Sequence, residues 1–244
     1  MDTPPTSTPL IRKLESILVL SDEERDVLRN VSGTIKTVGP RQDLVREGDR
    51  PHECCLILEG FAYRYKLTET GKRQIFSFHI PGDIPDLQSL HIDVMDHSLA
   101  ALTATKALFI PHESVCDLMR RCPRIGDAFW RDTLIDAAVF REWIMNLGRR
   151  EAYGRMAHLL CEFYVRLRAV GLTNGPAYES PLTQAELADA TGLSAVHVNR
   201  TLQELRGEGL ITLRNGSLAV LDWDRLQEAG EFDPAYLHLR QEAA

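Results

Sequence analysis

One short segment carries the side chains best suited to recognising nucleic-acid bases. An arginine, an asparagine and a glutamine lie between residues 194 and 203, and each can form two hydrogen bonds with one base edge. Arg200 is suited to guanine O6 and N7, and Val196 is suited to packing on a thymine methyl group. Hydroxyl and imidazole groups beside them suit phosphate contacts. The candidate DNA-binding residues are therefore Ser194, Val196, His197, Asn199, Arg200 and Gln203.

Two helices joined by a tight turn would position these side chains. Thr183 and Glu186 have the spacing of a capping box, in which each side chain satisfies a backbone N–H at the start of a helix. Gly192 can take the positive φ of a sharp turn, and Ser194 can cap the next helix. The second helix would bury the apolar residues that recur at helical spacing, which are Val198, Leu202 and Leu205.

A small β-hairpin is predicted directly after this helix pair. Two short apolar runs, 210–213 and 217–221, are separated by Arg214-Asn215-Gly216, and Asn-Gly favours a type I′ turn. Helix, turn, helix and hairpin together indicate a winged helix that reads DNA. The alternative is a capped helix pair with no role in DNA binding.

Composition restricts the class of protein. The chain has 244 residues, 44% of them hydrophobic, and a formal net charge of −7. This charge disfavours DNA binding over the whole surface, so the local field around the second helix matters. No apolar run has membrane-spanning length, and the first nine residues resemble a disordered lead rather than a secretory signal, so we expect a cytoplasmic protein. Arginines concentrate near the predicted helix pair: Arg149, Arg150, Arg155, Arg200, Arg206 and Arg214.

Cysteine and histidine spacing gives no metal motif. The five cysteines contain no C-x-x-C pair, and we expect each to pack in the core. The histidines are scattered along β-rich sequence. We therefore expect no metal and no cofactor.

The N-terminal half of the sequence has a different spacing of apolar residues and glycines. Residues 10–30 carry apolar residues at helical spacing, with a capping box at Ser21 and Glu24. From about residue 35 to 111, glycines divide short β-branched and aromatic runs, which is typical of an antiparallel sandwich or barrel. Residues 61–66 and 74–78 alternate with period two and are predicted to pair as a hairpin.

A long helix is predicted over residues 123–148. Apolar side chains repeat along it at alternating three- and four-residue intervals, as in a coiled-coil seam, so the expected partner is the same helix of a second copy. The alternative is that this helix packs only on its own β-domain. The predicted dimer interface consists of Trp130, Thr133, Ala137, Phe140, Ile144 and Leu147.

In this order of elements, the chain resembles the Crp/Fnr family of bacterial transcription regulators over nearly its whole length. The motifs that carry the resemblance are Val45-Arg46-Glu47-Gly48-Asp49, Leu56-Ile57-Leu58-Glu59-Gly60, Gly71-Lys72, Pro81-Gly82-Asp83, Tyr153-Gly154-Arg155-Met156-Ala157 and residues 182–211. The resemblance implies a cyclic-nucleotide-binding-type β-roll and a homodimer that binds an inverted-repeat operator in double-stranded DNA. It also implies RNA polymerase as a partner.

The resemblance fails in the effector pocket. Members that bind cyclic AMP hold the ribose with the Glu of a Gly-Glu-Leu stretch, whereas here Gly82-Asp83 is followed by Ile84-Pro85-Asp86. Their phosphate-binding Arg-Ser pair is replaced by His97-Ser98. We therefore expect that cyclic AMP does not control the protein. The alternative is a regulator that responds to a cyclic nucleotide, another small molecule or haem through a pocket at Asp86, His97 and Ser98.

The expected fold class is α+β, with an N-terminal antiparallel β-roll, a long dimerisation helix and a C-terminal winged helix-turn-helix. The expected divisions are a disordered lead (1–9), a β-roll domain with flanking helices (10–122), a dimerisation helix (123–148), a winged helix-turn-helix domain (149–222) and a tail (223–244). No nucleophile elbow, phosphate loop or metal-ligand spacing suggests an enzyme, so no catalytic residue is expected. An enzyme, or a ligand-binding module with a vestigial winged helix, remains the alternative.

Overall fold

The computed structural model describes residues 8–214 and 216–240. Two short helices come first, α1 (Thr8–Glu15) and α2 (Asp22–Arg29). The predicted capping box at α2 is confirmed, because Ser21 N donates to Glu24 Oε2 at 2.7 Å and Glu24 N donates to Ser21 Oγ at 3.2 Å. The sequence predicts a disordered segment over residues 1–9, and this prediction is wrong for its last two residues, because α1 begins at Thr8. Residues 1–7 lie outside the described part of the chain.

Two antiparallel sheets form the β-roll, as the glycine spacing predicts. One sheet has the strand order β1-β7-β3 and the other β2-β6-β4-β5. Gly60 shows why glycine divides the strands: its φ is +81°, and a Cβ atom there would lie 2.4 Å from the Ala104 carbonyl oxygen. The strands are β1 (Thr34–Val38), β2 (Asp43–Val45), β3 (Glu53–Glu59), β4 (Ala62–Leu67), β5 (Arg73–His79), β6 (Ser98–Ala101) and β7 (Thr105–Pro111).

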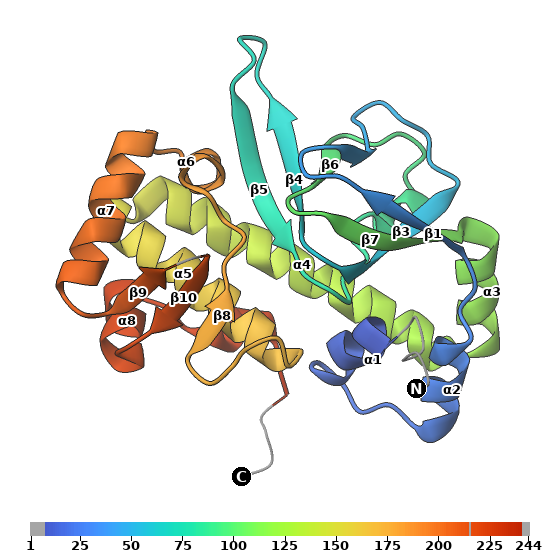
Figure 1. Cartoon of the computed structure of the whole chain (residues 1–244). Helices are drawn as coiled ribbons and strands as arrows, with labels where there is room; N and C mark the ends of the chain where they lie inside the picture. The colour runs from blue at the N-terminus through green and yellow to red at the C-terminus, as the bar shows by residue number, and fades with distance from the viewer. Residues whose placement is uncertain (1–7, 215, 241–244) are drawn as a thin grey trace.

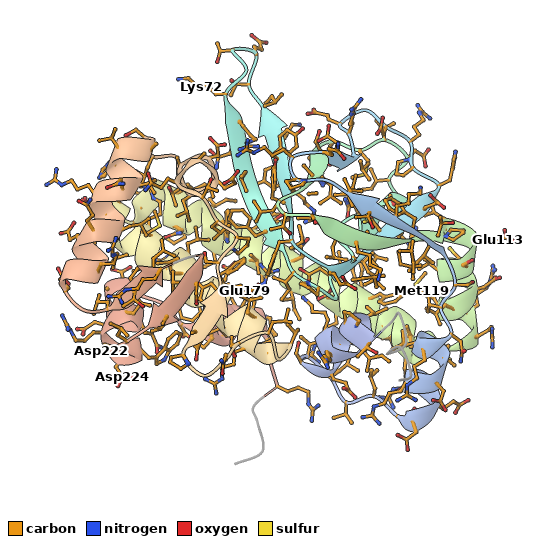
Figure 2. The ribbon with its side chains drawn as sticks, viewed as in Figure 1. Lys72, Glu113, Met119, Glu179, Asp222 and Asp224 are labelled. Atoms are coloured by element: carbon orange, nitrogen blue, oxygen red, sulfur yellow. The ribbon has the colours of Figure 1, made fainter. Side chains whose placement is uncertain are left out.

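The predicted hairpin between β4 and β5 is confirmed and extends beyond the body of the molecule (Figure 1). Its turn closes where Thr68 N donates to the Lys72 carbonyl at 2.8 Å, and Lys72 lies near the hairpin tip in Figure 2. The strand register shifts between Arg64 and Tyr65, which pair with Ser77 and Ile75, so Phe76 forms a bulge in β5 opposite this point. A short 3-10 helix, η1 (Leu87–Leu90), lies in the connection from β5 to β6.

Helix α4 (Pro123–Arg149) runs the length of the molecule behind the β-roll and continues to the C-terminal domain (Figure 1). It follows α3 (His112–Arg121), and Pro123 lies in its first turn, where a missing N–H is harmless. One face of α4 packs on its own chain and buries Ile125, Phe129, Ile135, Val139 and Trp143.

The C-terminal domain is built on α5 (Ala152–Ala169). It continues through α6 (Gln184–Thr191), α7 (Ala195–Gly207) and a three-stranded sheet of order β8-β10-β9. The predicted wing is β9 (Ile211–Arg214) paired with β10 (Ser217–Val220), and β8 (Ala177–Glu179) adds a strand that the sequence did not predict. Gly216 has φ +77°, but Asn215 of the expected type I′ turn lies outside the described residues.

The tail after residue 222 folds onto the molecule. It contains α8 (Trp223–Ala229), which packs on α5, and the 3-10 helix η2 (Pro234–Leu237). The Tyr236 hydroxyl donates to Glu162 Oε2 at 2.7 Å. Further along, Arg240 N donates to the Ser16 carbonyl at 2.8 Å. The tail therefore runs from the C-terminal domain to the segment that follows α1.

Candidate DNA-binding interface and sensor pocket

Local side-chain caps define the helix-turn-helix. Thr183 and Glu186 cap α6 as a capping box, and Gly192 ends the helix with φ +67°. Ser194 Oγ then accepts from His197 N at 3.2 Å and caps α7. The side chains of Val198, Leu202 and Leu205 are buried, as their spacing predicts.

The opposite face of α7 is open to solvent. Val196 is 81% exposed, and Ser194, His197, Arg200 and Gln203 are exposed as well. Asn199 is half-buried. The structure therefore brings the six candidate DNA-binding residues to the outer side of one helix, at the edge of the molecule (Figure 1).

A hollow of about 510 Å³ lies where α4, α5 and α7 meet. Arg149 and Arg200 line it, together with Tyr153, His197 and Glu204. The Tyr153 hydroxyl donates to Glu208 Oε2 at 2.6 Å and so links α5 to the end of α7. Two exposed guanidinium groups therefore lie beside the outer face of α7, with the carboxylates of Glu151 and Glu204 in the same hollow.

Two of the six arginines that the sequence places near this interface point inward. Arg155 donates to the carbonyls of Asn146, Leu147, Arg150 and Thr191, at 2.6 to 3.2 Å. Arg150 pairs with Glu142 at 2.8 Å. The Arg155 guanidinium holds the junction of α4 and α5 together, and the Arg150 guanidinium bonds back to α4. Arg149, Arg200, Arg206 and Arg214 remain exposed.

The three residues of the expected effector pocket make separate contacts in the β-roll. Asp86 is fully buried: Oδ1 accepts from Cys55 N at 2.7 Å, and Oδ2 has no partner. Ser98 Oγ accepts from Glu47 N at 3.0 Å. His97 Nδ1 lies 2.7 Å from Asp96 Oδ1, while its buried Nε2 has no partner. Among the described residues, no hydrogen bond or ion pair joins these three side chains to one another.

Arg64, which sequence reasoning missed, lies close enough for its charge to act on Asp86 and His97. Its Nε donates to the Pro85 carbonyl at 2.8 Å, its Nη2 donates to the same oxygen, and its Nη1 donates to Asp136 on α4. Burial opposes ionisation of Asp136, but Arg64 and His79 together outweigh it and lower the pKa of that carboxyl. Burial and then the Arg64 charge lower the pKa of His97. The positive charge of Arg64 therefore acts at the place where the sequence suggested an effector.

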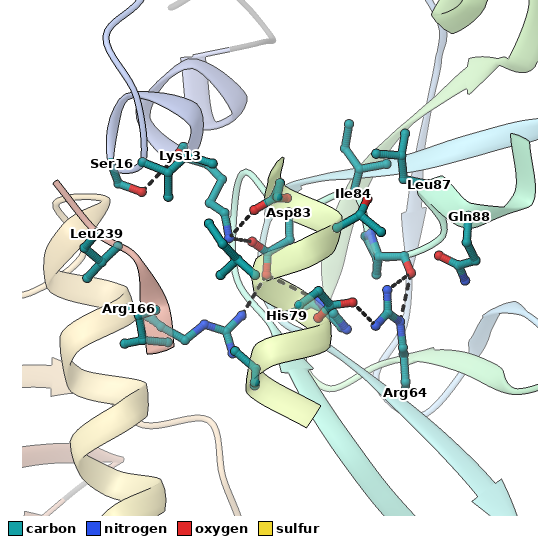
Figure 3. A pocket seen from close by; sticks show the side chains of 18 residues that line it. Lys13, Ser16, Arg64, His79, Asp83, Ile84, Leu87, Gln88, Arg166 and Leu239 are labelled. Carbon is teal, nitrogen blue, oxygen red and sulfur yellow. Dashed lines mark hydrogen bonds and ion pairs between the residues drawn. The ribbon is translucent and has the colours of Figure 1, made fainter. Parts of the chain in front are cut away.

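A cluster of buried charges joins the two domains (Figure 3). Asp83 accepts from Lys13 Nζ at 2.8 Å and from Arg166 Nη2 at 3.0 Å, so one carboxylate ties α1 and α5 to the β-roll. Burial opposes ionisation of Asp83, but Lys13, His79 and Arg166 hold its pKa well below the ordinary value. Lys13 also lies 3.3 Å from Asp132 on α4. The cavity around this cluster is small, about 60 Å³, so side chains fill most of the space around the Asp83 carboxylate.

Both domains match known families. A Crp-like helix-turn-helix domain matches residues 154–229, and a cyclic nucleotide-binding domain matches residues 35–122. The transcriptional activator protein FnrL of Cereibacter sphaeroides is 31% identical over 204 residues, which cover 78% of each chain. The chain belongs to the Crp/Fnr family of transcription regulators. The anr activator of Pseudomonas aeruginosa is 23% identical over 205 residues, 84% of each chain.

Solved structures of this family share the fold. FixK2 from Bradyrhizobium japonicum superposes with a TM-score of 0.74 at 21% identity, covering 81% of this chain and 97% of that one. The c-di-GMP responsive regulator CLP from Xanthomonas campestris has a TM-score of 0.65 at 16% identity, over 83% of this chain and all of that one. These regulators are not enzymes, and the helix-turn-helix of this regulator is a DNA-binding domain.

Other expectations concern metals and membranes. No group of three or more His, Cys, Asp or Glu residues within 8–214 and 216–240 could hold a metal ion. In this regulator Cys54, Cys55 and Cys161 are buried in the core as expected, whereas Cys116 and Cys122 are half-buried. Within the same residues, no helix is long and apolar enough to cross a membrane.

The buried Asp86 carboxyl makes the stability of this regulator depend on pH. Burial raises its pKa to about 6, although the Cys55 N–H opposes the shift. Because the folded pKa exceeds the unfolded one, stability is greatest below the unfolded pKa and falls as the pH rises through 6. Relative to an Asp86→Asn variant, the wild type should therefore lose about 2 kcal/mol of unfolding free energy from pH 4 to pH 7. Urea titrations at several pH values measure this difference.

An Asp93→Asn variant is the matched control, because Asp93 is exposed on the same connection between β5 and β6. Its unfolding free energy should follow that of the wild type at every pH. A constant difference between Asp86→Asn and the wild type across this range would show that folding does not raise the pKa of Asp86.

Proposed function

We propose that this regulator binds an inverted-repeat operator as a homodimer and contacts the bases with the outer face of α7. The observation that carries the proposal is the exposure of Val196, Arg200 and Gln203 on one helix face, beside the arginine-lined hollow. Ser194, His197 and Asn199 would contact phosphate or secondary base positions. Two α7 helices related by a two-fold axis would meet half-sites about 10 bp apart, centre to centre.

Dimerisation would use the outward face of α4. None of the six predicted seam residues is buried, and two are largely exposed: Ile144 at 71% and Trp130 at 64%. The alternative interpretation is partly right, because the other face of α4 packs on its own β-roll. A helix with one face buried and a second apolar face exposed is suited to pairing with another copy. Thr133, Ala137, Phe140 and Leu147 complete the proposed interface.

Cyclic AMP would not control this regulator. The stretch that follows Gly82 supplies Asp86, which is fully buried and bonded to Cys55 N, so it is not available to a ribose. His97 has a lowered pKa and is neutral near pH 7, so it offers no fixed positive charge to a phosphate. The CLP protein is described as responsive to c-di-GMP, and a response of this β-roll to another small molecule or haem is the competing proposal.

The remaining assignments follow from DNA binding. The regulator would act in the cytoplasm and contact RNA polymerase at its promoters. The division at residue 122 and the dimerisation helix 123–148 fit the elements found. The DNA-binding domain would extend past residue 222 to about 240, because α8 packs on α5 and Tyr236 of η2 donates to Glu162 of α5.

Replacing Arg200 tests the base-reading assignment. A guanidinium that forms two hydrogen bonds with guanine contributes about 1–3 kcal/mol of discrimination at each contact. Arg200→Ala should therefore weaken binding to the selected operator and relax the preference for guanine at one position of each half-site. Competition binding with operators selected from a random duplex library measures both effects.

Arg149→Ala is the matched control, since Arg149 lies in the same hollow but outside α7. It should weaken all sequences alike and reduce the salt dependence of binding. If Arg200→Ala lowers affinity equally for guanine-containing and guanine-substituted sites, Arg200 contacts phosphate and the assignment fails.

A further inference from the structure

We propose that Arg64 is a built-in effector: its guanidinium fills the sensor pocket and holds α4 on the β-roll in the DNA-binding arrangement, with no diffusible ligand. The inference deepens the proposed function and rests on it. Arg64 is a positioning residue, because it would act on DNA binding only through α4.

The side chain bridges two parts of the molecule that a ligand in this pocket would have to join. At one end, Nε and Nη2 donate to the carbonyl of Pro85, in the stretch that follows Gly82. At the other end, Nη1 donates to Asp136, and the guanidinium carbon lies 5.6 Å from the centre of the Phe140 ring. Figure 3 shows Arg64 beneath the 82–88 connection, with its dashed bonds to both sides.

Burial and strand geometry fix this position. Arg64 is 4% exposed, which is rare for arginine and requires that its donors find acceptors. It pairs with Ser77 and Leu99 on the neighbouring strands, and the bulge follows it directly. Phe76, in the bulged region of β5, contacts both the His97 ring at 5.5 Å and the Phe140 ring at 6.0 Å. The guanidinium is therefore enclosed by aromatic rings, a carbonyl and a carboxylate.

The attachment point on α4 explains why the bridge matters for DNA binding. Asp136 lies between the seam residues Thr133 and Ala137, and Phe140 follows one turn later. The same helix ends at Arg149, where the C-terminal domain begins. A bond that fixes α4 on the β-roll therefore fixes both the proposed dimer seam and the orientation of α7. Because the chain supplies this bond itself, operator binding needs no added ligand.

Chemical rescue tests the proposal. Arg64→Ala removes the guanidinium and two methylene groups, so ethylguanidinium is its missing fragment and ethylurea is a neutral analogue of similar shape. The readout is affinity for operator duplexes selected with the wild type, measured without ligand and with millimolar ethylguanidinium, ethylurea or cyclic AMP. We expect Arg64→Ala to bind about tenfold more weakly or worse, ethylguanidinium to restore most of the affinity, and ethylurea to restore none. None of the three compounds should change wild-type affinity.

Matched variants separate the bridge from general damage. Arg46→Ala removes an exposed arginine of the same β-roll, which pairs with Asp43 at 3.1 Å, and should bind like the wild type. Asp136→Asn keeps both bonds to Pro85 and breaks the ionic contact with α4, so it should weaken operator binding as well. If Arg64→Ala shows no cooperative thermal unfolding, the operator affinity of Asp136→Asn tests the proposal in its place.

The outcomes distinguish this inference from the proposed function. A wild type that selects no operator contradicts the proposed function. A wild type that binds operator only after cyclic AMP is added contradicts the built-in effector. Equal affinity of Arg64→Ala or Asp136→Asn and the wild type, or a folded Arg64→Ala that ethylguanidinium does not restore, overturns this inference alone.

Discussion

A variant with Ile144→Asp and Trp130→Asp should sediment as a monomer at concentrations at which the wild type is a dimer. Both side chains are mostly exposed in the single chain, at 71% and 64%, so their replacement should leave the fold of the protomer intact. In a helix pair, each carboxylate would be buried in an apolar seam without a partner. Sedimentation equilibrium measures the change. Phe140 is a poorer target, because its ring contacts Phe76 and Arg64.

Loss of the dimer should also cause the largest expected decrease in affinity for the operator. A dimer holds its second α7 close to the second half-site, and such linkage strengthens binding by about 10²–10⁴-fold over a single contact. The double variant should lose a factor of this size on a full operator and very little on a single half-site. Val19→Asp, at an exposed apolar position between α1 and α2, is the control and should change neither property. A double variant that remains dimeric would place the interface elsewhere on the molecule.

Arg166→Ala should lower the free energy of unfolding by about 3–5 kcal/mol, because it leaves the buried Glu162 carboxylate without a cation and Asp83 with Lys13 as its remaining cation. Arg166 Nη2 donates to Asp83 at 3.0 Å, and Nη1 lies 3.5 Å from Glu162. Burial already raises the pKa of Glu162, and Arg166 opposes that rise. Denaturant titration monitored by tryptophan fluorescence measures the loss, since Trp143 Nε1 donates to the same Glu162 carboxylate.

Arg50→Ala provides the matched control for this loss, because Arg50 is exposed on the loop before β3. Its unfolding free energy should stay within about 0.5 kcal/mol of the wild type. A similarly small change for Arg166→Ala would show that Lys13 alone keeps Asp83 satisfied.

The helix-turn-helix could be predicted because the residues that cap its helices are close together in the sequence. Thr183 and Glu186 lie three residues apart, as do Ser194 and His197, and each pair forms the cap that its spacing suggests. The β-roll was predictable for a similar reason, since glycines mark turns between short strands. Strand β8 was missed because its three residues show no periodicity, and only pairing with β10 defines it.

The charged contacts were not predictable because they join residues far apart in the chain. Arg64 and Asp136 are 72 residues apart, and Asp83 and Arg166 are 83 residues apart. A single arginine in a strand of alternating apolar and polar residues is ordinarily predicted to face solvent. Only the tertiary fold shows that Arg64 points inward to a carbonyl and a carboxylate. For the same reason, sequence alone could not separate the inward-facing Arg155 from exposed arginines such as Arg149.

The tail that reaches from α8 to Arg240 limits how the DNA-binding domain can move. The domain is joined to the rest of the chain at the α4–α5 junction, through the Asp83–Arg166 ion pair, and again where Arg240 bonds to the carbonyls of Glu15 and Ser16. A rigid body attached at two points can turn only about the line that joins them, and a third attachment away from that line stops this rotation. The two recognition helices of the proposed dimer can therefore change their separation only if one of these attachments breaks.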